Sequence, residues 1–141
     1  MGLLEDSGVI IKQDEKVIKR AQSNGKIPRG SWTGAVEDYH RLYKKNVREQ
    51  MKHSIFNKGE LVLTNHRLIA VGKLGLIKKN TIPFMDLALQ KIQSVNTEKP
   101  FIGKEALVVS LSTEPPGKAY FEVENPVEWV KTIKEQLSQS K

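Results

Sequence analysis

The sequence predicts one mainly β domain of about seven short antiparallel strands, completed by a C-terminal helix. Three observations predict this fold. Short apolar runs with alternating polar positions recur about every 8–12 residues, which is typical of an antiparallel sandwich or barrel. Turn-forming residues, such as Pro115-Pro116-Gly117, divide these runs. From Asn125 onward the apolar period becomes helical and follows a capping sequence.

Composition limits the number of domains and the class of protein. A chain of 141 residues has room for one hydrophobic core, so residues 1–141 are expected to form a single domain. The chain contains no cysteine, which excludes a disulfide framework and fits a cytoplasmic protein. No run approaches the ~20 apolar residues that a membrane-spanning helix requires.

The N-terminal part is expected to contain strands and then a loop. Residues 9–20 hold β-branched residues on both sides of the polar turn Gln13-Asp14-Glu15, which predicts a first strand or strand pair. Residues 23–31 are rich in Asn, Gly, Pro and Ser, which predicts a loop.

Residues 35–53 have a helical period and predict an inserted amphipathic helix, about residues 33–54 with its ends. Thr33 is placed to cap its N-terminus. Its apolar face repeats at threes and fours: Val36, Tyr39, Tyr43, Val47 and Met51. Its opposite side carries a basic stripe: Arg41, Lys44, Lys45, Arg48 and Lys52.

From Gly59 the apolar period returns to two. Leu61 and Leu63 are expected to point inward, Thr64-Asn65-His66 to form a turn, and Leu68 to begin the inward face of the return strand. Further strands are expected at residues 76–83, 92–97, 106–111 and 119–123.

The last element is expected to be a helix over about residues 125–138. Asn125 is a suitable N-cap, Pro126 suits the first helical position, and Glu128 stands where a capping-box carboxylate would. The apolar face of this helix consists of Trp129, Val130, Ile133 and Leu137.

The hairpin Gly59-Glu60-Leu61-Val62-Leu63-Thr64-Asn65-His66-Arg67-Leu68-Ile69 resembles the Gly-x-Leu-x-Leu-Thr-x-x-Arg-Leu-Ile hairpin of PH-like domains of the GRAM, bacterial-PH and GLUE types. The resemblance covers about residues 59–137 and, more loosely, residues 8–20. It implies a PH-like, seven-stranded antiparallel barrel or sandwich capped by the C-terminal α-helix. Beside the turn, Arg67 is expected to play a structural role, with carbonyl or carboxylate oxygens as its partners.

Within that superfamily the order of segments is most similar to the GLUE domain, the ubiquitin- and phosphoinositide-binding module of an ESCRT-II subunit. Ser7-Gly8-Val9-Ile10 resembles its opening strand, and Phe101-Ile102-Gly103-Lys104 falls where it has a Gly-Ile-Gly-Lys-like loop. The helix at residues 35–53 departs from the pattern and is interpreted as an insertion. The resemblance implies a non-catalytic adaptor in ESCRT-type protein sorting, with other ESCRT subunits as further partners.

No residue pattern predicts catalysis, a metal or a cofactor. His40, His53 and His66 have no second ligand at zinc-like spacing. Carboxylates that are adjacent in sequence point in different directions on a helix and make poor acid–base partners. No P-loop, dinucleotide fingerprint or nucleophile elbow is present. We therefore expect a protein that is not an enzyme and has no cofactor.

The charge of the chain is uneven and favours an anionic partner. Residues 1–104 carry a net charge of +9 and residues 105–141 of −2, which gives the +7 of the whole chain. Anionic lipid, nucleic acid, an acidic protein surface and a simple excess of lysine all stay open. PH-like domains bind phosphoinositides through clustered basic residues at one open end, which implies Lys19, Arg20, Lys26, Arg29, Lys73, Lys78 and Lys79, with peripheral membrane association.

For ubiquitin, the family's mode implies the loop from Thr113 to Lys118 and the exposed side of the last helix. Phe121 and Val127 are the apolar candidates for this contact, and both could equally be core residues. The basic stripe offers an alternative, nucleic-acid binding through Arg41, Lys44, Lys45, Arg48 and Lys52. A further alternative is docking of the inserted helix on a partner subunit, because its apolar face must be buried somewhere.

Overall fold

The structure is a computed structural model that describes residues 3–43, 53–74, 80–99, 104–113 and 116–139. The described residues contain seven strands, which form one sheet with antiparallel pairing throughout. They are β1 (Val17–Pro28), β2 (His53–Thr64), β3 (Arg67–Leu74), β4 (Asn80–Ala88), β5 (Ile92–Glu98), β6 (Ala106–Leu111) and β7 (Gly117–Glu122). The predicted mainly β fold with a terminal helix is confirmed.

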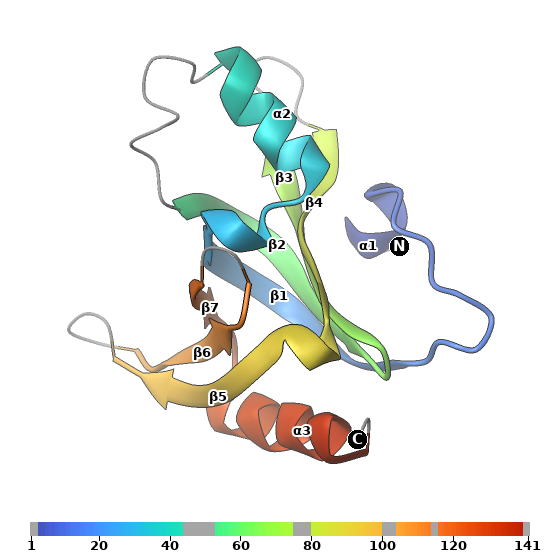
Figure 1. Cartoon of the computed structure of the whole chain (residues 1–141), viewed down its shortest axis with the longest axis vertical. Helices are drawn as coiled ribbons and strands as arrows, with labels where there is room; N and C mark the ends of the chain where they lie inside the picture. The colour runs from blue at the N-terminus through green and yellow to red at the C-terminus, as the bar shows by residue number, and fades with distance from the viewer. Residues whose placement is uncertain (1–2, 44–52, 75–79, 100–103, 114–115, 140–141) are drawn as a thin grey trace.

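The sheet order is β4-β3-β2-β1-β7-β6-β5, so every pair of neighbours is consecutive in sequence except β1 and β7 (Figure 1). β1 belongs to both halves of the sheet, since it pairs with β2 from Val17 to Pro28 and also with β7 from Asn24 to Lys26. β1 thereby joins two halves of the sheet, one formed by β2, β3 and β4 and the other by β5, β6 and β7.

The main core lies between these two halves. Leu61, Leu63 and Leu68 are fully buried in it, as predicted. At its centre the ring of Phe56 contacts those of Phe84 and Phe121, with centroids 5.1 and 6.5 Å away. Both halves of the sheet therefore contribute to one packed interior.

Helix α3 (Pro126–Gln139) closes the core on the side of β5 and β6 (Figure 1). Trp129 and Ile133 are fully buried, which confirms the predicted apolar face. Glu128 does not face its own cap: its Oε1 accepts a hydrogen bond from Lys19 Nζ of β1 at 3.4 Å. The expected terminal helix is present, and this contact also attaches it to β1.

The N-terminal part differs from the prediction. Residues 9–16 form no strand; after α1 (Leu3–Asp6) the chain crosses beside the sheet, and β1 begins only at Val17 (Figure 1). β1 then runs through the predicted loop to Pro28, followed by the short 3-10 turn η1 (Arg29–Ser31). Asn24 and Gly25 are used in a bulge rather than a loop, because β2 and β7 supply backbone partners there.

The inserted helix is present as α2 (Gly34–Tyr43), which lies beside β4. Thr33 caps it, as predicted: its Oγ1 accepts a hydrogen bond from the Val36 N–H at 3.5 Å, and Val36 is fully buried. Residues 44–52 lie outside the described residues. At residue 53 the prediction was wrong, since His53 already belongs to β2, whose first residues pair with β1.

Candidate anionic-partner site

Successive strands meet at one end of the sheet, here called the Pro28 end. There β1 ends and β2 begins, with Pro28 paired to His53, and β3 and β4 meet at the pair Leu74 and Asn80. β7 begins beside them, because a Cβ on Gly117 would lie 2.7 Å from the ring of Pro28. At the opposite end, here called the His66 end, residues 65–66 join β2 to β3.

The predicted lipid-binding residues do not form one cluster. Lys26, Arg29 and Lys73 lie toward the Pro28 end, at the finish of β1 and β3. Lys19 and Arg20 lie toward the His66 end, between six and ten residues before Lys26 and Arg29, which is roughly 20–33 Å at the usual rise of a strand. Lys78 and Lys79 lie outside the described residues. The prediction of a single site was therefore wrong, because β1 is a continuous strand where a loop was expected.

The two basic residues toward the His66 end are bound by acidic residues of the same chain. Arg20 forms paired hydrogen bonds of 2.8–3.0 Å with the carboxylates of Glu5 and Glu60, which raise its pKa. Lys19 contacts Glu128 and lies 5.5 Å from the ring centroid of Trp129. Their charges are matched internally, so these residues hold the fold together.

At the Pro28 end, two cations are available. Lys26 and Lys73 are exposed, and neither ammonium group has a hydrogen bond or ion pair among the residues that the structure describes. Arg29 is engaged, since it contacts Glu37 at 3.5 Å and lies 5.8 Å from the centroid of the Trp32 ring. Arg41 belongs to α2, and the rest of the basic stripe, Lys44, Lys45, Arg48 and Lys52, lies outside the described residues.

A groove of about 510 Å³ lies on the outer face of β1, β2 and β7, next to the Pro28 end. Its lining includes Ile55, Lys26 and Tyr120, which are direct cross-strand neighbours in that order. Ile55 is 63% exposed. Sequence reasoning assigned no role to Ile55 or Tyr120. The available signal was that Ile55 and Phe56 are adjacent in a strand, so that one of them had to face outward.

The predicted ubiquitin-contact residues are separated in the structure. Phe121 is fully buried against Phe56, so its assignment as a contact residue was wrong. Lys118 pairs with Glu98 at 3.4 Å near the Pro28 end, and Thr113 lies in the connection before it. Val127 lies at the start of α3, is 62% exposed, and is next in sequence to Glu128, which pairs with Lys19 of β1. Among the apolar candidates, Val127 alone presents its side chain to solvent.

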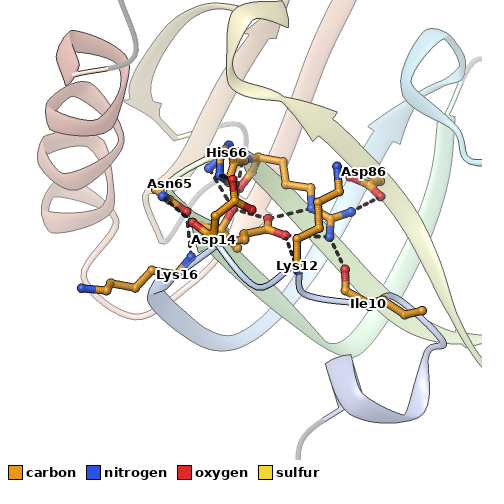
Figure 2. Close-up of polar contacts among 10 residues, drawn as sticks. Ile10, Lys12, Asp14, Lys16, Asn65, His66 and Asp86 are labelled. Carbon is orange, nitrogen blue, oxygen red and sulfur yellow. Dashed lines mark hydrogen bonds and ion pairs between the residues drawn. The ribbon is translucent and has the colours of Figure 1, made fainter.

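Arg67 has the structural role that was predicted for it, and Figure 2 labels two of its partners, Ile10 and Asp86. Its guanidinium donates to Glu15 at 2.8 and 3.0 Å, to Asp86 at 2.7 Å and to the carbonyl of Ile10 at 2.6 Å. Burial alone would raise the pKa of Glu15, but hydrogen bonds from Arg67, Thr64 and the Lys12 N–H outweigh it and lower the pKa to about 2. This network holds the N-terminal segment against the β2–β3 turn.

No protein-family model matches the chain, and no curated protein matches it in sequence. Within the described ranges, no helix is long and apolar enough to cross a membrane. The same residues contain no group of three or more His, Cys, Asp or Glu side chains placed to hold a metal ion.

Proposed function

We propose that the chain is a PH-like domain of the GLUE type and acts as a non-catalytic adaptor module in ESCRT-type protein sorting. The arrangement of the sheet supports the fold assignment: a meander of antiparallel strands in which β1 also pairs with β7, followed by a helix packed on β5 and β6. The hairpin that carries the resemblance forms β2 and β3, with its leucines in the core and Arg67 at the turn.

The first proposed partner is an anionic, phosphoinositide-type membrane surface, approached by the Pro28 end. The observation that carries this proposal is that Lys26 and Lys73 are exposed there and have no ion pair within the described ranges, whereas Lys19 and Arg20 are paired with carboxylates. Each basic residue near an anionic surface contributes ~1 kcal/mol of attraction. Reversible recruitment then needs several such residues, and the connection after Lys73 adds Lys78 and Lys79 in sequence.

Co-sedimentation of the full chain with vesicles tests this proposal. We expect binding to phosphatidylcholine vesicles that contain phosphatidylserine and a phosphoinositide, and little binding to phosphatidylcholine alone. Lys73→Glu should weaken binding, while Lys131→Glu, the same charge change at an exposed position of α3, should change it far less. Equal binding to both kinds of vesicle would overturn the membrane proposal.

The second proposed partner is ubiquitin or a ubiquitin-like protein, bound by the exposed start of α3. The supporting observation is the exposed Val127 beside the Lys19–Glu128 pair, since a ubiquitin contact normally requires an exposed apolar residue. NMR titration of the labelled chain with ubiquitin should shift the amides around Val127. A titration without residue-specific shifts would remove this partner.

The basic residues between Arg41 and Lys52 keep nucleic acid as an alternative partner of the same module. Salt-sensitive retention of a labelled oligonucleotide that is lost in a Lys44→Glu, Lys45→Glu variant would favour this alternative over the membrane. Retention that these substitutions leave unchanged would count against a role of the stripe.

A further inference from the structure

The outer row formed by Ile55, Lys26 and Tyr120 combines three kinds of side chain in one line across β2, β1 and β7. Ile55 projects into solvent with 63% of its surface exposed, while its strand neighbours Ser54 and Phe56 are each 2% exposed. A single exposed aliphatic residue is ordinary in proteins. The significance of Ile55 comes from the side chains next to it.

Lys26 lies between Ile55 and Tyr120 and points to the same outer face. Directly opposed residues in antiparallel strands have Cβ atoms about 4.5–5.5 Å apart, so the three side chains are in contact range. Lys26 has no ion pair within the described part of the chain. Tyrosine places an apolar ring and a polar hydroxyl at the same boundary, and lysine can lay its methylenes on apolar surface while its ammonium reaches water or phosphate.

We propose that this row is the part of the domain that contacts the lipid bilayer. Ile55 enters the boundary between headgroups and acyl chains, a lipid phosphate occupies the groove beside Lys26, and Tyr120 lies at headgroup depth. This inference rests on the proposed membrane function. It specifies which face of the domain contacts the membrane and which side chain enters it.

The distribution of acidic residues favours this face over the exposed Val127 at the start of α3. The carboxylate that lines the groove, Glu122, lies two residue pairs further from the Pro28 end and accepts a hydrogen bond from Asn24 at 3.4 Å. Val127 is as exposed as Ile55, but Glu128 follows it directly and Glu124 precedes it closely in sequence. Lys26 thus gives the Ile55 row a positive charge without an ion pair among the described residues, whereas the charge next to Val127 is that of the Lys19–Glu128 pair.

The absence of cysteine allows a direct test with single labels on the full chain. Ile55→Cys and Val127→Cys, matched in exposure at 63% and 62%, are each coupled to a fluorophore whose emission shifts to the blue in an apolar environment. Each labelled protein is mixed with phosphatidylcholine vesicles with and without phosphatidylserine and a phosphoinositide. Binding of the same samples is measured by co-sedimentation.

We expect the label at residue 55 to shift to the blue with anionic vesicles and the label at residue 127 to stay unchanged. If the protein sediments with these vesicles but only the label at residue 127 responds, or neither does, the inference is overturned while the proposed membrane function stands. If the unlabelled chain does not sediment with anionic vesicles, the proposed membrane function fails, and this inference fails with it.

A charge-neutral variant tests the lysine separately. Lys26→Gln should lower the vesicle partition coefficient about fivefold, the equivalent of the ~1 kcal/mol contributed by one lysine near an anionic surface. Lys131→Gln on α3 is the control. Unchanged binding by a folded Lys26→Gln protein, with its fold checked by circular dichroism, would overturn the role of Lys26.

Discussion

Glu15 is the clearest case in which one residue determines a property of the protein. Its carboxylate is fully buried and is held charged by Arg67, with a pKa of about 2 instead of the usual 4.5. Because the folded-state pKa is below that of the unfolded chain, the stabilisation is complete above about pH 5 and is lost as the pH falls toward 2. The lost stabilisation is on the order of 3 kcal/mol.

We therefore predict that Glu15→Gln destabilises the protein at neutral pH and removes most of this acid dependence. Urea unfolding at several pH values between 2 and 7 measures both effects. Asp14→Asn is the matched control, since the Asp14 side chain is 80% exposed and its loss should leave the pH profile nearly unchanged. A Glu15→Gln protein with the wild-type profile would show that another group controls the acid transition.

Gly25 shows how a position in β1 depends on the core beneath it. A Cβ at residue 25 would lie 2.4 Å from the ring of Phe56, which is itself enclosed by Phe84 and Phe121. Gly25→Ala should therefore lower the free energy of unfolding by about 2 kcal/mol, as for other overpacked cores.

Gly34→Ala is the control for this substitution, because a Cβ there meets nothing within 4 Å and the residue begins α2. It should leave stability unchanged or raise it by a few tenths to ~1 kcal/mol. Urea unfolding measures the free energy of unfolding of both variants. Equal values for the two variants would contradict the proposed packing around Phe56.

The residues around Arg67 also show which contacts can be predicted from the sequence and which cannot. The hairpin pattern predicted a structural arginine beside the turn, since Thr64, Asn65 and Arg67 are close in sequence. Glu15 was not predicted as its partner, because the two residues are 52 positions apart. Only the path of the chain before β1 brings them together.

At the scale of elements, the segment of residues 3–16, here called the N-terminal strap, covers the outer face of β2 and β3. Leu4 packs there with Val62, Ile69 and Val71 in a small cluster separate from the main core. Arg20 clamps the strap through Glu5, and Arg67 clamps it through Glu15 and Ile10. The strap thus gives the sheet a covered second face.

We predict that Leu4→Ala releases the strap without unfolding the sheet. A buried leucine at the edge of a small cluster is worth about 2 kcal/mol or more, so the amides of the strap should lose hydrogen-exchange protection while those of β6 keep it. Ile10→Ala, at a position that is 78% exposed, should leave the exchange pattern of the strap unchanged. Global loss of protection in Leu4→Ala would contradict a separately opening strap.

Elements defined by local patterns were predicted well, and those defined by distant partners were not. The β2–β3 hairpin, β6 and α3 carry their signals within a few residues, through alternation, turn chemistry and helical period. Residues 9–16 of the strap were mistaken for part of a strand because Val9, Ile10 and Ile11 are β-branched. In the structure Val9 and Ile11 pack on a face of the sheet, and Ile10 is exposed. Residues 23–28 of β1 were mistaken for a loop because their pairing with β2 and β7 is non-local.

At the scale of the whole molecule, the sign of the charge was visible in the sequence, but its grouping was not. The net charge of +7 indicated an anionic partner. Which basic residues are free to bind a partner depends on where the fold places the acidic ones. Glu128 lies next to Lys19, and Glu60 lies next to Arg20. Lys19 and Arg20 are therefore matched by carboxylates, whereas Lys26 and Lys73 have no ion pair among the described residues.

The exposure of Lys26 and Lys73 predicts that high salt weakens membrane binding while the stability of the fold changes little. The Debye length falls from about 10 Å at 0.1 M ionic strength to about 3 Å at 1 M, which screens exposed charges far more than buried ones. Sedimentation of the full chain with anionic vesicles should therefore be lost over this range, since Lys26 and Lys73 are exposed. The free energy of unfolding from urea titrations should change little, since the Glu15 side chain in the Arg67 pair is fully buried. Binding that survives 1 M salt would mean that apolar insertion at Ile55, and not the lysines, dominates the attraction to the membrane.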